Sequence, residues 1–216
     1  GNDQTVAALI TNTTVAGVRT VVSLRPATLT INQNLAAAAF DGAFTGMVRL
    51  VKAGPGTLTV TATNTTASGG MVISNGTLVA ASTNCCGQGP VELCNGTLHT
   101  ALTNAQPLAL DRLVWHGAGQ IRTALAADGS ASRLQIARTF TRGEGTNFVF
   151  DFSGSGTPNR TYTLLTFASS DSAVQDFRYR NLGTNRYANL CGEFQLAAQT
   201  LTLHTFFPSA TIMLIR

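Results

Sequence analysis

The tripeptide Gly-Thr-Leu occurs three times at a constant spacing, as Gly56-Thr57-Leu58, Gly76-Thr77-Leu78 and Gly96-Thr97-Leu98. Each copy begins 20 residues after the previous one, and short alternating runs of Thr with apolar residues surround the copies. An alternation with a period of two predicts strands, and the Gly, Asn and Ser clusters between them predict turns. The spacing therefore predicts a stack of similar rungs in which Leu58, Leu78 and Leu98 form a core stack.

The length of the repeat favours one architecture over its alternatives. Two or three short strands in about 20 residues fit one rung of a parallel β-helix, with Leu or Val pointing inward and Thr outward. We expect an all-β fold, a right-handed parallel β-helix (β-solenoid) with rungs of about 20 residues. A β-sandwich or jelly roll is the alternative, because its strands also recur every 8–12 residues, but it predicts no fixed recurrence of one tripeptide. The consensus of leucine-rich repeats is absent.

The strand pattern continues along nearly the whole chain. We therefore expect residues 1–205 to form a single β-solenoid domain, followed by an apolar C-terminal tail at 206–216. The longest apolar runs, such as residues 210–215, are far shorter than the roughly 20 residues of a transmembrane helix, which excludes a membrane span. Neither end shows the polar repeat or amphipathic helix that caps monomeric solenoids, so we expect both ends to be open.

The composition points to an exported protein. Charged residues make up 11% of the chain, against roughly 25% in average soluble domains, and 32 Thr and 12 Ser give a neutral, hydroxyl-rich surface. The 13 Arg and one Lys are scattered, whereas nucleic-acid binders concentrate them in a basic stripe, so we expect no nucleic-acid partner. No basic-then-apolar leader precedes the first strand pattern, and we expect any signal peptide to have been removed.

Four cysteines, Cys85, Cys86, Cys94 and Cys191, are disulfide candidates. Their spacing does not match the paired Cys-x2-4-Cys of zinc sites. The even number suits an oxidising, extracellular compartment. We expect two disulfides, one local to Cys94 and one reaching Cys191, while four cysteines leave three pairings open.

Three segments around the first two repeat copies carry a family resemblance: residues 50–61, 64–70 and 75–79. They resemble the autotransporter-associated β-strand repeat, which runs Leu-x-Lys-x-Gly-x-Gly-Thr-Leu, Asn-Thr-Tyr-Ser-Gly-Gly and Gly-Gly-Thr-Leu. Thr66-Ala67 stands where the repeat has Tyr, and Asn75 replaces a common Gly. The resemblance implies an exported right-handed β-helix of the passenger type and no catalytic residue. The chain is too short to hold the membrane barrel of autotransporters as well, so we expect a passenger without it.

Candidate catalytic residues are sparse. Enzymes built on a β-helix need clustered carboxylates for calcium binding or proton abstraction. Only Asp151 with Asp171, and Asp111 with Asp128, recur loosely at the spacing of a rung, and Asp at such positions more often caps turns. The histidines form no metal-binding pattern. We therefore expect no enzymatic activity, no cofactor and no metal.

The leading hypothesis is a secreted structural protein, a subunit of an extracellular or cell-surface fibre or matrix assembled end to end. A passenger-type adhesin that binds glycans is the alternative. Trp115 and His116 are the candidate glycan contacts for it, although a Trp in a solenoid more often fills a corner of the core. A polysaccharide-active enzyme is the third hypothesis.

Assembly is expected to be a head-to-tail homopolymer, because both termini are apolar. The tail beyond Pro208 either pairs as an added strand with the next subunit or folds back onto its own last rung. Contacts between two different ends propagate instead of closing. The candidate assembly residues are Val6, Leu9, Phe206, Phe207, Ile212, Met213, Leu214 and Ile215.

Overall fold

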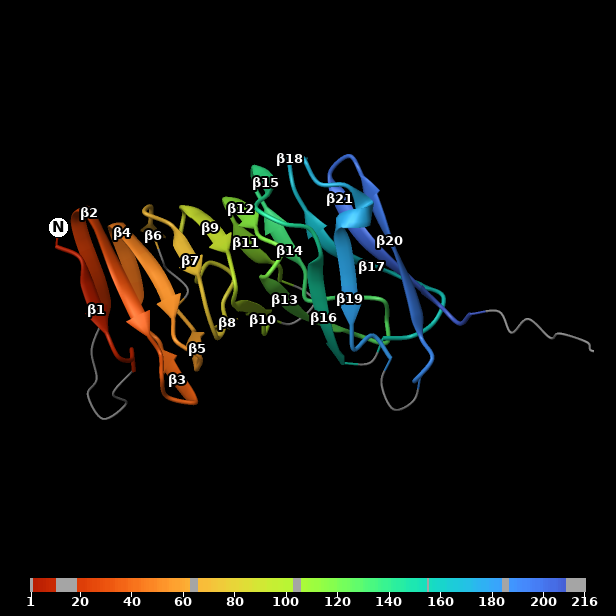
Figure 1. Ribbon diagram of the computed structural model, residues 1–216, viewed down its shortest axis with the longest axis horizontal. Helices are drawn as coiled ribbons and strands as arrows, with labels where there is room; N and C mark the ends of the chain where they lie inside the picture. Colours follow the sequence, from red (N-terminus) through yellow and green to blue (C-terminus); the bar gives the residue numbers. More distant parts are fainter. Residues whose placement is uncertain are drawn as a thin grey trace, which may run out of the picture.

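A computed structural model describes residues 2–10, 19–62, 66–102, 106–154, 156–183 and 187–208. The chain is a β-solenoid of about five turns, with rungs of about 22 residues on average. Strands of successive rungs lie side by side along its long axis, from β1 (Gln4–Val6) at one end to β20 (Cys191–Ala197) and β21 (Thr200–Phe206) at the other (Figure 1). The prediction of an all-β solenoid is confirmed.

Three sheets run along the solenoid. The first sheet has the order β1-β2-β4-β7-β9-β12-β15-β18, and β6 also pairs with β4. Besides β1 it contains β2 (Thr20–Asn32), β4 (Ala43–Ala53), β6 (Thr66–Ala67), β7 (Met71–Ile73), β9 (Pro90–Leu93), β12 (Arg112–Trp115), β15 (Thr139–Arg142) and β18 (Ser169–Ser170). The second has the order β3-β5-β8-β10-β13-β16-β19, with β3 (Ala37–Phe40), β5 (Thr57–Val60), β8 (Thr77–Ala80), β10 (Thr97–Thr100), β13 (Gln120–Leu125), β16 (Phe148–Gly154) and β19 (Phe177–Arg180). The third has the order β11-β14-β17-β21-β20 and contains β11 (Leu108–Leu110), β14 (Leu134–Ile136) and β17 (Arg160–Thr166) in addition to β20 and β21.

The Gly-Thr-Leu repeat sets the register of the second sheet. Leu58 pairs with Leu78, and Leu78 pairs with Leu98, in parallel strands. All three side chains are fully buried, in the stack that the spacing predicts. Alternate residues of these strands are half-buried on the outer face, because successive side chains of a strand point to opposite sides.

The rungs become longer after the third repeat copy, so the constant spacing of the tripeptide holds only for the rungs that contain it. In the second sheet Leu98 pairs with Ile121, and Ile121 pairs in turn with Phe150. Phe150 then pairs with Tyr179. The additional residues between these partners supply the third sheet, whose strands begin only at β11, and they enclose a wider core.

Aromatic rings fill this wider part of the core. The buried Trp115 ring lies between 5.2 and 6.4 Å from four phenylalanine rings, those of Phe140, Phe148, Phe150 and Phe177. The first rungs are filled mainly by Leu, Ile and Val instead. A change from aliphatic to aromatic filling matches the larger cross-section that the longer rungs enclose.

The turn before each inward leucine is a tight corner. Gly76 has a φ of +67°, and a Cβ there would lie 2.5 Å from the carbonyl oxygens of Gly54 and Gly56. The position therefore accepts only glycine. Beneath it lies Lys52, whose side chain is fully buried and whose Nζ donates hydrogen bonds to the carbonyls of Ala53, Gly54 and Asn75 at 2.9–3.0 Å.

Burial of the Lys52 ammonium lowers its pKa from the usual 10.5 to about 8. The three carbonyls that accept its hydrogen bonds belong to two successive corners, around Gly54 and Asn75. Lys52 therefore joins these two corners from inside the solenoid.

The only helical element described is η1 (Val174–Asp176), a single 3₁₀ turn of three residues. Accordingly, the part of the chain that the structure describes holds no helix of the length and hydropathy required to cross a membrane.

Candidate functional site

The N-terminal end of the solenoid exposes large apolar side chains. Leu24 and Val22 in β2 are 85% and 58% exposed, and Met47 in β4 is 48% exposed. The register between β2 and β4 is irregular from Ser23 to Ala27, which places Leu24 in the bulged segment opposite Met47. We call Val22, Leu24 and Met47 the N-terminal patch. Exposed apolar side chains on neighbouring strands make this surface a candidate for contact with another molecule.

Part of the outer edge of β2 is also unpaired among the described strands. Strand β1 pairs only with residues 29–31 of β2, and β4 occupies the opposite edge. Asp3 adds one contact, because its Oδ1 accepts a hydrogen bond from the Thr28 amide at 2.7 Å. The described part of this end therefore combines free strand edge with the N-terminal patch, which is what a further strand or a second protein needs for docking.

The C-terminal end is closed, contrary to the expectation that both ends are open. Strands β20 and β21 form an antiparallel hairpin, and β21 pairs antiparallel with β17, so the parallel stacking of the third sheet ends there. Phe194 of β20 packs over the aromatic core, with its ring 5.7 Å from those of Phe150 and Phe177. Sequence patterns missed this cap because the alternation in a hairpin strand is the same as in a solenoid rung.

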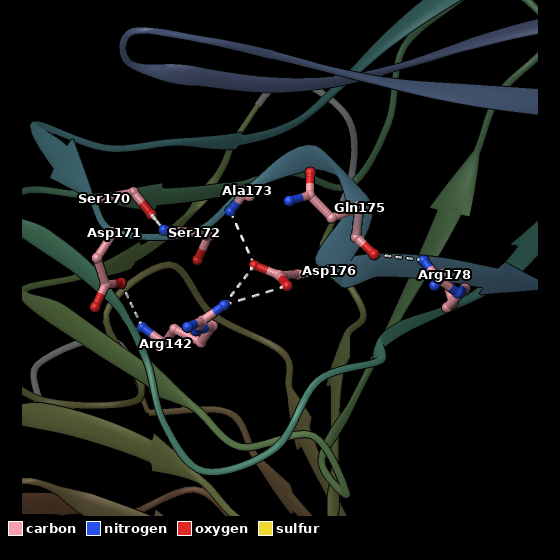
Figure 2. A network of polar contacts seen from close by, with 8 residues as sticks. All are labelled: Arg142, Ser170, Asp171, Ser172, Ala173, Gln175, Asp176 and Arg178. Carbon is pink, nitrogen blue, oxygen red and sulfur yellow. Dashed lines mark hydrogen bonds and ion pairs between the residues drawn. The ribbon is translucent and has the colours of Figure 1, made fainter.

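A polar network holds the last turn beside this hairpin (Figure 2). The buried Asp176 carboxylate in η1 lies 3.3 Å from Arg142 Nη1 and accepts a hydrogen bond from the Ala173 amide at 2.9 Å. The backbone amide of Arg142 donates to Asp171 Oδ1 at 2.6 Å. Arg142 at the end of β15 is thereby joined to the segment between β18 and β19. The buried Asp176 carboxylate therefore has partners within the network, and the exposed Asp171 binds the backbone of Arg142, so both contacts stabilise the turn.

A second charged cluster runs across three rungs of the second sheet. Arg122, Asp151 and Arg180 occupy paired positions in β13, β16 and β19. Asp151 is nearly buried, lies 2.7 Å from Arg122 Nη2 and 3.3 Å from Arg180 Nε, and accepts a hydrogen bond from Asn181 at 2.6 Å. Burial opposes ionisation of Asp151, but the hydrogen bonds from Asn181, Arg180 and Arg122 outweigh it and lower the pKa of the carboxyl. The equal spacing of the three charges along the chain was the available signal in the sequence.

The carboxylate pairs considered from the sequence belong to these separate interactions. Asp171 bonds the backbone of Arg142, whereas Asp151 bonds arginines of its own sheet. Asp111 pairs with Arg112 and Arg138, and Asp128 accepts hydrogen bonds from Ser130. Among the described residues, no group of three or more His, Cys, Asp and Glu is arranged to hold a metal ion.

The expected glycan contact at Trp115 was wrong. Its side chain is fully buried, and the indole Nε1 donates a hydrogen bond to the carbonyl of Gly119 at 2.9 Å. Inward residues of β12 form the core, so the ring serves packing and cannot stack on a sugar. His116 is half-buried next to it and accepts a hydrogen bond from the Glu144 amide at 3.0 Å.

An open depression with a volume of about 410 Å³ lies elsewhere on the surface, and its lining mixes apolar residues with four polar side chains; we call it the polar groove after these side chains. Exposed Asn84 and Gln88 lie on one side, and the ion pair of Asp111 with Arg138 lies on the other. Amide, carboxylate and guanidinium groups are the hydrogen-bonding partners that bind hydroxyl-rich ligands. Sequence patterns did not indicate this groove, because its residues come from three rungs.

All four cysteines are free thiols in the structure, and neither expected bridge is present. Cys94 follows β9, whereas Cys191 begins β20, and strands β12, β15 and β18 extend the first sheet beyond β9. Stacked rungs lie about 4.8 Å apart, so these two thiols are too distant for a bond. Cys85 and Cys86 are buried, and their Sγ atoms lie 3.9 Å apart.

The candidate assembly residues fall into three groups. Val6 and Leu9 are half-buried against the hydrophobic core near the open end. Phe206 ends β21, and Phe207 is 48% exposed with its ring 5.9 Å from Tyr187. The remaining four lie outside the described residues: Ile212, Met213, Leu214 and Ile215.

Comparison with known families agrees with the repeat. Residues 50–80 match the model of the passenger-associated-transport-repeat family. The matched segment contains Lys52, the corner at Gly76 and the first two stacked leucines. No curated protein matches the chain significantly.

Proposed function

We propose that this chain is an exported, passenger-type structural protein, a β-solenoid subunit of an extracellular or cell-surface fibre. The passenger-associated repeat at residues 50–80 supports export, and the neutral, hydroxyl-rich composition suits life outside the cell. The less exposed carboxylates Asp111, Asp151 and Asp176 pair with arginines in structural clusters. We therefore assign no catalytic role to them.

The observation that carries assembly is the difference between the two ends. The N-terminal patch and the unpaired edge of β2 offer apolar area and backbone hydrogen-bonding groups. The other end has its core covered by the hairpin, and among the described strands the outer edge of β20, the last strand of the third sheet, has no partner. A contact between unlike ends repeats without limit, which gives a filament.

Electron microscopy and light scattering of the purified chain test this proposal. We expect filaments in the unchanged protein and their loss in Leu24→Glu, because a charge in the N-terminal patch must be desolvated on contact. Ala118→Glu is the matched control, since it adds the same charge at an exposed position on the side of the middle rungs. Monomers at every concentration, or closed dimers through two N-terminal ends, would contradict a fibre subunit.

The polar groove favours a second candidate function, an adhesin that binds glycans. Asn84, Gln88 and Asp111 present donors and acceptors to this open groove of about 410 Å³. A glycan array with the unchanged chain and with Asn84→Ala tests this function. Binding that is retained in Leu24→Glu but lost in Asn84→Ala would support the adhesin in place of the fibre.

A further inference from the structure

The adjacent Cys85 and Cys86 form a buried dithiol that the proposed function does not use. Their Sγ atoms lie 3.9 Å apart, with one thiol donating to the other. Both residues are essentially inaccessible, at 0% and 2% exposure. A buried free cysteine packs like a small apolar residue, so burial by itself assigns the pair no role; two thiols in contact within one turn can nevertheless join without moving another part of the chain.

The other cysteines are poor partners for this pair. Cys94 is separated from it by strand β9, whose four residues span about 13 Å. Cys191 lies in the hairpin at the C-terminal end, several rungs away. Each thiol of the pair therefore has the other as its nearest sulfur among the cysteines.

The turn that carries the pair is fixed at both of its ends. The Thr83 carbonyl accepts a hydrogen bond from the Ala109 amide at 2.8 Å, and the Gln88 amide donates to the Ala67 carbonyl at 2.9 Å. These bonds anchor the turn to both neighbouring rungs. Between the anchors, Gly87 has a φ of +79°, a left-handed conformation that glycine adopts without strain.

We propose that Cys85 and Cys86 are a reversible redox pair that closes to a disulfide between neighbouring residues. The oxidant is an external disulfide, from a small thiol such as glutathione or from a protein thiol oxidase. This inference does not depend on fibre formation, since it concerns one turn of one chain.

The reaction proceeds by two exchange steps. Both sulfurs are buried in the reduced chain, so the turn between its two anchors must first open locally and bring Cys85 to the surface. The Cys85 thiolate then attacks one sulfur of the external disulfide, whose S–S bond breaks, and the first external thiolate leaves and takes up a proton. Cys86 then loses its proton, and its sulfur attacks Cys85, which forms the bond within the chain and releases the second external thiol. Two electrons and two protons pass from the chain to the external disulfide.

The hydrogen-bonding arrangement gives the two sulfurs different roles. The hydrogen bond between the two thiols lowers the pKa of Cys85 and raises that of Cys86, and burial raises the pKa of Cys86 further. Cys85 is therefore the attacking sulfur, and Cys86 is the resolving one.

The ring formed by two neighbouring cysteines makes the bond labile. Adjacent Cα atoms are only about 3.8 Å apart, below the usual range of about 4.4–6.8 Å for disulfides. Such strain makes a disulfide more easily reduced than a structural one. The pair therefore acts as a switch, and Asn84 and Gln88 on either side of it transmit a change to the wall of the polar groove.

The test uses the full chain with Cys94→Ser and Cys191→Ser, two half-buried positions whose replacement spares the core. The protein is equilibrated over a series of reduced-to-oxidised glutathione ratios, unfolded, alkylated and weighed by mass spectrometry. We expect alkylation to fall from two groups per chain to none, with loss of the mass of two hydrogen atoms, and to recover with excess reduced glutathione. Adding Cys85→Ser gives the matched control, which retains Cys86 and cannot form the ring.

The unchanged chain provides an independent readout, because cleavage after Leu93 separates the pair from Cys94 and Cys191. A disulfide confined to the fragment with Cys85 and Cys86 supports the proposal. Two alkylatable thiols at every glutathione ratio would overturn it. So would a bridge from either residue to Cys94, to Cys191 or to a second chain.

Discussion

Lys52, the single lysine of the chain, is a buried cation whose hydrogen-bond partners are backbone carbonyls. Its pKa is about 8 in the folded chain and 10.5 when exposed, so the unfolded chain binds the extra proton between these values. Stability therefore rises with pH across this interval, by about 1.4 kcal/mol per unit and roughly 3 kcal/mol in full. Below pH 8 the cost of burying the charge is constant.

Urea denaturation at pH 7, 9 and 10.5 measures this effect as a difference between the unchanged chain and Lys52→Met. Thiols also titrate in this range, but they are common to both proteins and cancel. We expect the free energy of unfolding of the unchanged chain to increase relative to that of Lys52→Met as the pH rises. Parallel pH profiles would show that Lys52 is solvated in the folded state.

The stacked leucines give the second prediction at this scale. Truncation of Leu58, Leu78 or Leu98 to Ala leaves a cavity in a fully buried column and should cost roughly 2–5 kcal/mol each. Thr59→Ala, on the outer face of the same sheet, should cost less than about 1 kcal/mol. Thermal and urea denaturation compare the four variants, and equal effects of Leu58→Ala and Thr59→Ala would contradict the assigned register.

At the scale of the elements, the Arg122–Asp151–Arg180 cluster ties three strands together. Asp151→Asn leaves two arginines facing a neutral amide, and we expect the free energy of unfolding to fall by about 2–3 kcal/mol at pH 7. The loss is smaller than for a fully buried ion pair, because both arginines are partly exposed. Glu92→Gln breaks the more exposed pair with Arg49 and should cost less than about 1 kcal/mol.

The same cluster predicts a dependence on acid. The pKa of Asp151 is lower in the folded chain than its value near 3.8 in the unfolded chain. The ionised carboxylate therefore contributes fully to the free energy of unfolding above pH 3.8, and this contribution is lost as the pH falls through the folded-state pKa. Urea denaturation from pH 7 down to pH 2 should therefore show the unchanged chain converging on Asp151→Asn. A constant difference over the whole range would assign the effect of the substitution to packing instead.

The β20–β21 hairpin closes the core, and Phe194 is its inward contact. Phe194→Ala should cost roughly 2 kcal/mol and expose the rings beneath it, because the side chain is half-buried against the aromatic core. Binding of an environment-sensitive apolar dye reports the opening. Gln195→Ala changes the neighbouring exposed residue and should bind no more dye than the unchanged chain. Equal dye binding by both variants would place the cap elsewhere.

For the whole molecule, the sequence predicted the strand register where the rungs repeat but not where they differ in length. Gly-Thr-Leu at a constant spacing predicted the solenoid and the buried leucine column, because identical rungs must stack identical residues. The longer rungs of the second half carry no repeated tripeptide, and their register depends on how aromatic side chains such as Phe150 fill the wider core.

The candidate sites depended on contacts between rungs, which a single sequence does not show. Trp115 is of a residue type that binds sugars, and only its position on the inward face of β12 shows that it packs in the core. The closed C-terminal end was missed for a similar reason, since parallel and antiparallel strands share one alternation. Cys85 and Cys86 were visible as neighbours, but their burial and distance from Cys94 required the fold.

The two ends of the molecule should also differ in how readily they open. Solenoid rungs contact only their neighbours, so unfolding proceeds from an end, and the less stabilised end opens first. The N-terminal end has an exposed β2 and the N-terminal patch, whereas the C-terminal end has the hairpin and the aromatic core. Hydrogen exchange followed by mass spectrometry should show β1, β2 and β3 exchanging before β13, β16 and β19. Phe194→Ala should reduce the difference in exchange rate between the two ends, because it destabilises the closed end. Gln195→Ala should leave this difference unchanged. Faster exchange in β16 and β19 than in β2 of the unchanged chain would show that the hairpin is not the stabilising end.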